Sequence, residues 1–410
     1  MTLRLSTASI YATGTNQINT LQSQMAKTQM QLSTNKRVLT AADDPIASAR
    51  ALEVTQSQSM NTQYGTNRSN AKASLSLVDK TLQDVSLQFQ DIQELIVKGG
   101  NATYLQSDRE ALATELEGRL SDLIGLANTA DGTGGYLFSG YKSTTQPFSK
   151  TPTGATYQGD QGQRSLQVGS SRKMAVSESG SAIFETIKTG NGKYQALAGD
   201  KNTGAGIVSP GAVTDSSKLT GHDYAIEFSV TGDPAVTTYN VRDKALTAPA
   251  DIIQANQAYT PGATIAFDGM SLDIKGAPAN GDSFTVEPSE SQSAFSSITD
   301  LIATLRMPAE GSGGKAALAN RLAEAGSNMK NALDNVLTVQ ASVGARLKEI
   351  DYLDSTGDDL NIQYQDTLET LTGLDMVKTI SLFAQQQTTL QAAQVSFKTM
   401  SGLSLFNYIS

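Results

Sequence analysis

The chain has 410 residues, of which 39% are hydrophobic and 6% aromatic, and it carries a formal net charge of −9 at pH 7. This length suits two to four domains. The acidic balance, with no block rich in Lys or Arg, argues against binding of nucleic acid and of anionic membranes. The absence of cysteine excludes a disulfide scaffold, a thiolate zinc site and a cysteine nucleophile. No run of about 18 apolar residues occurs, so we expect no membrane insertion.

The amino-terminal segment lacks the pattern of a cleaved secretory signal. Met1–Gln22 carries one early cation, Arg4, but no apolar core behind it. A cleaved signal needs such a core, about 7 to 15 residues long. We therefore expect no cleaved signal, and composition alone would place the chain in the cytosol.

Proline and glycine divide the chain into three parts. Eight of the ten prolines lie between Pro147 and Pro288, and glycine is dense from Gly132 to Gly314. Because both residues interrupt helices and mark turns, we predict helical ends and a middle of strands. The predicted fold is mainly α, with a long antiparallel helical bundle or coiled coil built from both chain ends. A β-rich middle domain would be inserted at the tip of this bundle.

The first long helix is predicted over residues 67–98 and should end at Gly99–Gly100. Its apolar residues follow a 3-4-3-4-3-4 spacing, which is typical of a coiled-coil seam, although an ordinary helical bundle fits the same spacing. These residues are Leu75, Val78, Leu82, Val85, Phe89, Ile92 and Ile96. We expect a second helix to begin with a capping box of Ser107 and Glu110 and to fold back as an antiparallel hairpin. Its apolar face would consist of Leu112, Leu116, Leu120, Leu123 and Ala127.

A third long helix on the carboxy-terminal side should pair with this hairpin and close the bundle. One apolar stripe continues through it on both sides of a weak stretch near Gly357. The stripe consists of Val336, Val343, Leu347, Ile350 and Leu353, followed by Leu360, Tyr364, Leu368 and Leu371.

The two extreme ends of the chain carry few charges and one narrow apolar stripe each. The stripes are Ile18, Leu21, Met25 and Leu32 at the front, and Met376, Ile380, Phe383, Leu390, Phe397 and Met400 at the back. A helix of this kind buries too little surface alone to offset its ordering entropy. We therefore expect both ends to be mobile in the free chain and to fold against each other, and against neighbouring subunits, on assembly.

The middle of the chain, residues 145–290, is predicted to form small antiparallel sheets. Apolar and polar residues alternate in Asp223–Val230 and in Ser283–Val286. Gly269 and Gly276 punctuate the apolar run Thr264–Ile274, as turns between short strands do.

The residues that could carry chemistry do not form a catalytic constellation. His222 is the single histidine, and a lone histidine in a loop is most often solvated. The histidine count excludes a histidine-based zinc site, although a site made only of carboxylates stays open. Gly132–Gly135 and Gly311–Lys315 fit neither a phosphate loop nor a dinucleotide fingerprint, and we interpret both as flexible connectors. We predict no catalytic residue, no metal site and no cofactor.

Asp43–Asp44 is the most suggestive acidic pair. Paired carboxylates can act as an acid/base dyad or bind a cation. Pro45 follows directly, however, and this arrangement is typical of a helix start. We favour the interpretation in which Asp44 caps a helix and Pro45 takes its first position.

Short segments in a fixed order along the chain carry a family resemblance. They are Leu32-Ser33-Thr34, Lys36-Arg37, Ala42–Ala47, Gly135–Gly140, Tyr157–Asp160, Gly276–Phe284 and Met400–Ile409. Together they resemble the flagellin-like family of the bacterial flagellum, and within it the hook-filament junction proteins. The resemblance covers both ends of the chain and is weak between Lys188 and Thr260.

The resemblance implies a structural role and a location outside the cell. Members of this family are exported unfolded through the flagellum's own type III channel by an uncleaved signal, which replaces the cytosolic assignment. The implied partners are further copies of the chain in a ring, the first hook-associated protein, flagellin, and an export chaperone on the carboxy-terminal helix.

The stripes and the resemblance together suggest three domains. Residues 1–42 with 374–410 would form a terminal helical domain that lines the inner tube. Residues 43–144 with 291–373 would form a helical rod, and residues 145–290 an outer β-rich domain. The expected assembly interface comprises Ile18, Leu21, Met25, Leu32, Asp43, Asp44, Pro45, Met376, Ile380, Phe383, Leu390, Phe397, Met400, Leu403, Leu405 and Phe406.

Three other interpretations stay open on the sequence alone. A flagellin, the filament subunit itself, belongs to the same class and would differ by polymerising into long filaments. A secreted enzyme could carry its site on a β domain above a helical stalk. An adhesin fibre of a phage or secretion system would explain the heptads but not the tail Leu403–Ile409.

Overall fold

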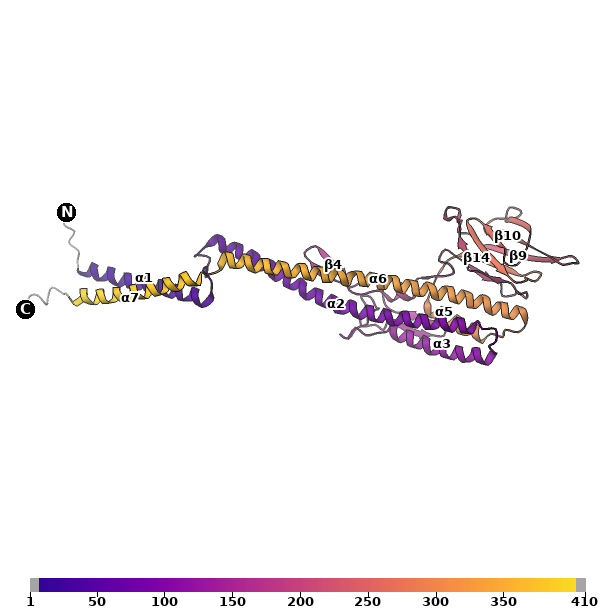
Figure 1. Cartoon of the computed structure of the whole chain (residues 1–410), viewed down its shortest axis with the longest axis horizontal. Helices are drawn as coiled ribbons and strands as arrows, with labels where there is room; N and C mark the ends of the chain where they lie inside the picture. Colours follow the sequence, from indigo (N-terminus) through magenta and orange to yellow (C-terminus); the bar gives the residue numbers. More distant parts are fainter. Residues whose placement is uncertain (1–6, 403–410) are drawn as a thin grey trace, which may run out of the picture. The chain divides into compact units, whose positions relative to one another are not determined.

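The computed structural model describes residues 7–402, which contain seven α-helices, fifteen strands and one 3-10 helix (Figure 1). The chain divides into two compact units, one made of Met1–Thr66 with Tyr352–Ser410 and the other of Asn67–Asp351. Helices occupy both ends and strands the middle, so the predicted fold class is confirmed. No helix within residues 7–402 combines the length and the apolar character that crossing a bilayer requires.

Helix α2 (Pro45–Gly99) and helix α6 (Gly311–Thr372) form the long antiparallel pair of the bundle. All seven predicted seam residues of α2 are buried, and Gly99 ends the helix as predicted. Polar contacts at their edges fix the register, because Lys72 Nζ lies 2.6 Å from Asp351 Oδ1 and Gln340 Nε2 donates to Asp79 Oδ1 at 3.2 Å. The helix is longer than predicted, since it begins at Pro45.

Helix α3 (Gln106–Ala127) folds back on α2 as the predicted hairpin, with Arg119 on α3 2.8 Å from Asp91 on α2. The four predicted face residues from Leu116 onward are buried, and Leu112 is half-buried. The predicted capping box at Ser107 is wrong by two residues. Leu105 is the N-cap, and its backbone N–H donates to Asp108 Oδ2 at 2.8 Å. The carboxylate of an aspartate at the third helical position accepts the backbone N–H of the N-cap residue. This half of a capping box does not depend on the side chain at the N-cap.

Helix α6 runs unbroken through the stretch that the sequence marks as weak. Gly357 is buried against α2, where Asn61 Nδ2 donates to its carbonyl oxygen at 2.7 Å and to Asn361 Oδ1 at 3.0 Å. Glycine allows the two backbones to approach closely, and the buried amide satisfies the carbonyl. A polar pair thus continues the seam where apolar residues are missing.

Neither of the two glycine-rich segments is a flexible connector, so that prediction is wrong. Gly311–Lys315 forms the first residues of α6. The loop at Gly132–Gly135 is closed by Asp131, whose Oδ1 accepts the backbone N–H groups of Thr133 and Gly135 at 2.9 Å each. Such an Asx turn orders a loop through local hydrogen bonds.

Helix α5 (Ala294–Arg306) packs against α3 and was not predicted. It begins at Ser293, whose hydroxyl accepts the backbone N–H of Phe295. Phe295 enters an aromatic cluster in which its ring centroid lies 4.9 Å from that of Phe148 and 5.4 Å from that of Phe184. Buried aromatic rings of this kind contribute much of the packing energy of a small core.

Short strands near this cluster form two-stranded pairs beside the helices. These are β1 (Phe148–Thr151) with β2 (Gly154–Tyr157), β3 (Ser165–Gly169) with β4 (Arg172–Ala175), and β5 (Ile187–Lys188) with β15 (Ser291–Gln292), with α4 at Gly180–Phe184. The β3–β4 hairpin is tied to α6 by Arg172, whose Nε lies 2.6 Å from Glu349 Oε1. The segment that follows β4 is tied to α6 by the buried Glu178, whose Oε1 lies 2.6 Å from Arg346 Nη1. This hairpin therefore belongs to the helical part of the second unit.

The remaining strands form two sheets that share one core. The five-stranded sheet has the order β11 (Ile252–Ala258), β10 (Val236–Asp243), β9 (Tyr224–Thr231), β14 (Ser283–Pro288), β6 (Tyr194–Ala198). The other joins β12 (Thr264–Phe267), β13 (Met270–Lys275) and β7 (Ile207–Val208), with β8 (Ala212–Val213) also on β13 and the 3-10 helix η1 at Ser216–Lys218. Tyr224, Phe228, Phe284 and Leu272 are buried between them. The predicted alternation in Asp223–Val230 and Ser283–Val286 is thus confirmed.

Candidate functional site

The first unit pairs the two terminal helices of the chain. Helices α1 (Thr7–Thr34) and α7 (Met376–Gly402) run antiparallel, since Tyr11 packs on Phe397 at one end while Lys36 bridges Gly373 at the other. The Tyr11 hydroxyl also donates to the carbonyl of Ser401 at 3.2 Å. The structure therefore brings together the two segments in which the sequence places the apolar stripes. Leu403, Leu405 and Phe406 lie outside the described residues.

The inner face of α1 follows a regular 3-4 spacing. It consists of Tyr11, Gly14, Ile18, Leu21, Met25, Thr28 and Leu32, and the four residues that the sequence marked are all half-buried. Gly14 and Thr28 were missed because neither is strongly apolar, although Thr28 is 3% exposed. Both residues could have been predicted from their spacing, because Gly14 lies four residues before Ile18 and Thr28 four residues before Leu32.

The inner face of α7, here called the seam face, consists of Thr379, Phe383, Gln386, Leu390, Ala393 and Phe397. Leu390 is buried, and Phe383 and Phe397 are half-buried. The other marked residues of α7 are exposed, by 42% at Met376, 54% at Ile380 and 52% at Met400. The structure therefore divides the predicted stripe into a covered and an uncovered part.

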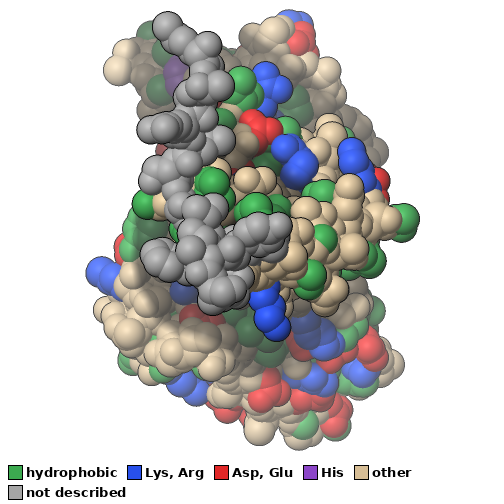
Figure 2. Space-filling model, turned by 90° about the vertical axis from the view of Figure 1, so that its left-hand side faces the viewer, with side chains coloured by type: hydrophobic (Ala, Val, Ile, Leu, Met, Phe, Trp, Pro, Cys, Tyr) green, Lys and Arg blue, Asp and Glu red, His purple; other side chains and the backbone are tan. Residues whose placement is uncertain are grey.

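A second set of apolar residues lies on the opposite side of α7. This outer face consists of Val377, Ile380, Ala384 and Val395, all of them exposed. Val377 is 81% exposed and Val395 65%. Figure 2 views the molecule from one end and shows hydrophobic side chains at the surface among charged and uncharged ones. Since α1 covers only the seam face, the outer face has no partner among residues 7–402 of the chain.

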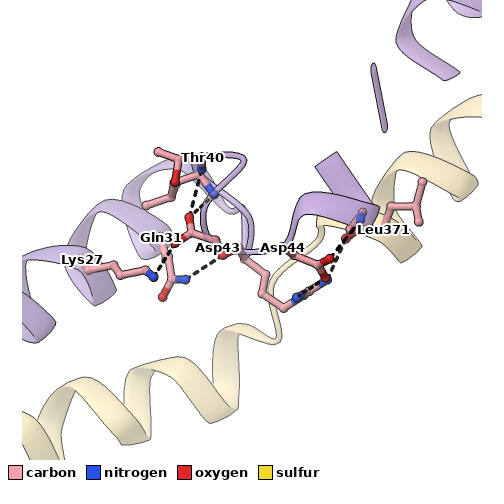
Figure 3. Close-up of polar contacts among 9 residues, drawn as sticks. Lys27, Gln31, Thr40, Asp43, Asp44 and Leu371 are labelled. Carbon is pink, nitrogen blue, oxygen red and sulfur yellow. Dashed lines mark hydrogen bonds and ion pairs between the residues drawn. The ribbon is translucent and has the colours of Figure 1, made fainter. Parts of the chain in front are cut away.

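The connection from α1 to α2 is organised by Asp43 (Figure 3). Its Oδ1 lies 2.5 Å from Lys27 Nζ, and its Oδ2 accepts the backbone N–H groups of Thr40 at 2.9 Å and Leu39 at 3.0 Å. The hydrogen bond from Lys27, followed by that from Thr40, holds the pKa of the Asp43 carboxyl well below its usual value. Asp43 is thus a charged centre that folds the connection around itself.

Asp44 begins the next helix, as the sequence predicts. Its Oδ1 accepts the backbone N–H of Ala47 at 3.0 Å, and Pro45 is the first residue of α2. Its Oδ2 accepts hydrogen bonds from Nη1 and Nη2 of Arg37, at 3.2 Å each. The N–H of Ala47 and then the Arg37 guanidinium lower the pKa of Asp44. Asp43 and Asp44 have different partners, so the geometry supports capping and not an acid/base dyad.

Arg37 was not predicted as a site residue, yet it connects two passes of the chain. Its Nη2 donates to the carbonyl of Leu371 at 2.9 Å, and its backbone N–H donates to the carbonyl of Thr372 at 2.7 Å. Both acceptors lie at the end of α6, and Gln31 Nε2 donates to the Arg37 carbonyl at 2.7 Å. We call Arg37, Asp43, Asp44 and Lys27 with these acceptors the corner. Arg37 could have been noticed in the sequence because it is a cation in a segment that carries few charges.

Two polar side chains of the second unit pair with carboxylates. His222 is partly solvated, with 38% of its side chain exposed, and it is also paired, since its Nδ1 lies 2.8 Å from Oδ2 of the buried Asp243. Tyr224 donates to Asp268 Oδ2 at 2.7 Å in the same region. Residues 7–402 contain no cluster of three His, Cys, Asp or Glu that could hold a metal ion.

Comparison with known proteins identifies relatives along the whole chain. Residues 5–143 match the bacterial flagellin N-terminal helical region, and residues 197–288 match the D2-like domain of flagellar hook-associated protein 1. The flagellar hook-associated protein 3 of Escherichia coli strain K12 is 29% identical over 405 residues, which are 98% of this chain and 99% of that protein.

Solved structures agree with these sequence relatives. Flagellar hook-associated protein 3 of Legionella pneumophila superposes with a TM-score of 0.74 at 30% identity, over 78% of this chain and 98% of that one. A structure of the flagellar junction protein FlgL from the same organism gives 0.72 at 29% identity, over 79% and 100%. With its paired terminal helices, long bundle and inserted β domain, the chain belongs to the family of flagellar hook-associated protein 3.

Proposed function

We propose that this chain is a structural adaptor that joins the flagellar hook, through another hook-associated protein, to the flagellin filament. The relatives are structural proteins of the flagellum, and one of them is described as its junction protein. The match of the front of the chain to flagellin and of the β domain to hook-associated protein 1 supports an adaptor with likeness to both neighbours. We infer in the same way that the chain catalyses no reaction.

The observation that carries this proposal is the pair of apolar faces on α7. Exposed apolar residues on a second side of a surface helix leave apolar area in water that a partner can cover. In the single chain α1 covers the seam face, while Val377, Ile380 and Val395 are exposed by half or more. Further copies of this chain, arranged as a ring, would cover the outer face. Each Å² of apolar surface removed from water would favour assembly by about 25 cal/mol.

The three suggested domains follow from this arrangement as proposals. Residues 1–42 with 374–410 would line the inner tube, and residues 43–144 with 291–373 would form the surrounding rod. Of residues 145–290, the two sheets that share one core would face outward, whereas the β3–β4 hairpin stays with the rod. Asp43, Asp44 and Pro45 would then fix the bend between the inner and the outer layer. The contacts of Asp43 with Lys27 and of Asp44 with Arg37 support this role, because they tie α1 to the start of α2.

The partners follow from the same role. The first hook-associated protein would contact one side of the ring and flagellin the other, outside the cell. Before export through the flagellar type III channel, without a cleaved signal, a chaperone would shield α7. The exposed apolar residues Val377, Leu382 and Val395 are consistent with such a client helix.

Electron microscopy of a strain that lacks this gene tests the proposal. Bare hooks, with flagellin shed into the medium, are expected. Hooks that keep their junction ring but carry no filament, in a strain that makes no flagellin, would show that the chain is the filament subunit. Normal filaments would overturn the adaptor role.

A further inference from the structure

The terminal helix pair contains an interior glycine that helix formation does not explain. Gly14 lies within α1, where glycine costs about 1 kcal/mol relative to alanine. An ideal Cβ at this position would lie 2.6 Å from Cδ2 and 2.9 Å from Cε2 of Phe397. The Phe397 ring therefore fills the space that any side chain at position 14 would need.

Further contacts hold the Phe397 ring in this place. The Tyr11 ring meets it edge to face, with ring centroids 5.7 Å apart and planes at 88°. Tyr11 is itself tied to α7, because its hydroxyl donates to the carbonyl of Ser401. The arrangement is a knob on α7 that fits a hole in α1, as in coiled-coil packing.

The need for such a fit arises because apolar residues lie on two sides of α7, although the outer face also carries Thr388, Gln391 and Lys398. The seam face includes Leu390 and Phe397, and the outer face includes Val377 and Val395. Residues 395 and 397 are two positions apart, so their side chains point about 200° apart around the helix. Burial of apolar surface favours the face with the larger apolar area, but it is non-directional and does not fix how the two helices mesh.

We propose that Gly14 and Phe397 form a selective lock that determines which face of α7 packs against α1. With Val395 turned toward α1, the smaller side chain would leave the hole at Gly14 unfilled. A void of this kind loses dispersion contacts on every side that lines it. The lock therefore keeps the seam face inward and leaves the outer face free. It is a property of the single chain, so it does not depend on the proposed function.

Accessibility of introduced cysteines tests the lock, because the natural chain has none. Ala393→Cys reports on the seam face and Val395→Cys on the outer face, each as the single cysteine of the full-length protein. In the unsubstituted background, maleimide should label position 393 about tenfold more slowly than 395, the ratio expected for an opening free energy of about 1.4 kcal/mol. Gly14→Leu fills the hole and should reverse this order, because the smaller Val395 side then fits α1 better.

Two further variants make the result specific. Thr13→Leu adds the same side chain at an exposed neighbouring position and should leave the order unchanged. Adding Phe397→Ala to Gly14→Leu places the large side chain on α1 and the small one on α7. This double variant should restore the original labelling order, with position 393 slower than 395. An unchanged order in Gly14→Leu would overturn the lock. Fast labelling of both positions in Gly14→Leu would also overturn the lock, because the glycine would then only permit contact between the helices. Equal labelling rates at positions 393 and 395 in the unsubstituted protein would overturn it as well.

Discussion

Arg37 joins two parts of the chain that are 334 residues apart in the sequence. Its guanidinium contacts Asp44 and the carbonyl of Leu371, so one side chain ties the start of α2 to the end of α6. A planar group with several donors suits this double role better than an ammonium group does. Arg37 therefore positions the corner.

Arg37→Gln should loosen the corner without unfolding the second unit. The loss of the bond to the Leu371 carbonyl should cost about 1 kcal/mol. Limited proteolysis between α1 and α2 should become faster, and filament attachment in a complemented deletion strain should weaken. Arg50→Gln, at an exposed position on α2, is the matched control. Equal cleavage rates in the two variants would show that Arg37 does not hold the connection.

Asp43 makes the corner sensitive to acid. Its pKa is lowered in the folded chain, mainly by Lys27, so folding favours the ionised form. The stabilisation is complete well above the unfolded value of 3.8 and is lost as the pH falls through and below it. Melting curves of the full chain should therefore show Asp43→Asn less stable than the natural protein at pH 7, with the gap closing toward pH 2. Asp359→Asn, on the exposed side of α6, is the control, and a gap independent of pH would contradict the assignment.

At the scale of elements, apolar spacing predicted the helices well because their seams are regular. The seven apolar residues of α2 and most of those of α3 are buried as expected. The features that apolar spacing did not predict depend on polar residues. Asn61 bonds to the Gly357 carbonyl and so continues a seam that no apolar residue marks. The start of α3 depends on Asp108 and not on Ser107, and such choices are settled by local geometry that spacing does not reveal.

The sequence located the apolar residues of the terminal helices but not the direction in which each one faces. Spacing showed that α7 has many apolar residues, yet it merged Ile380 and Phe383 into one stripe. Only the pairing with α1 separates the covered from the uncovered residues. Arg37 and Gly14 escaped prediction because their roles depend on contacts with Leu371 and Phe397, which lie at the other end of the chain.

Pro45 illustrates how an element boundary can affect assembly. It occupies the first position of α2, where its fixed φ suits the helix and its missing N–H costs nothing. Pro45→Ala should destabilise the corner by about 0.4–1 kcal/mol through the added freedom of the unfolded chain. We expect slower ring formation and weaker filament attachment in motility and shear assays. Pro308→Ala, ahead of α6 in the other unit, is the control, and unchanged attachment in the Pro45 variant would count against the bend.

At the scale of the whole molecule, the proposed function assigns folding and assembly to different faces of α7. The seam face of α7 is covered within the chain, and the outer face is not. Substitutions on the first should therefore lower the stability of the chain itself. Substitutions on the second should spare the single chain and act only when subunits meet.

Val377→Asp combined with Val395→Asp tests this separation. Both side chains are largely exposed, so the melting temperature and the labelling of a cysteine at position 393 should stay unchanged. In the assembled ring the two carboxylates would lose water, and burying charge is unfavourable unless it is fully paired. The variant should therefore be exported but leave hooks bare in electron micrographs. Val236→Asp, on the exposed side of β10, carries the same kind of change and should still support filaments. Filaments on hooks of the double variant would show that the outer face of α7 stays in water after assembly, and the partner surface would then have to be sought on α1.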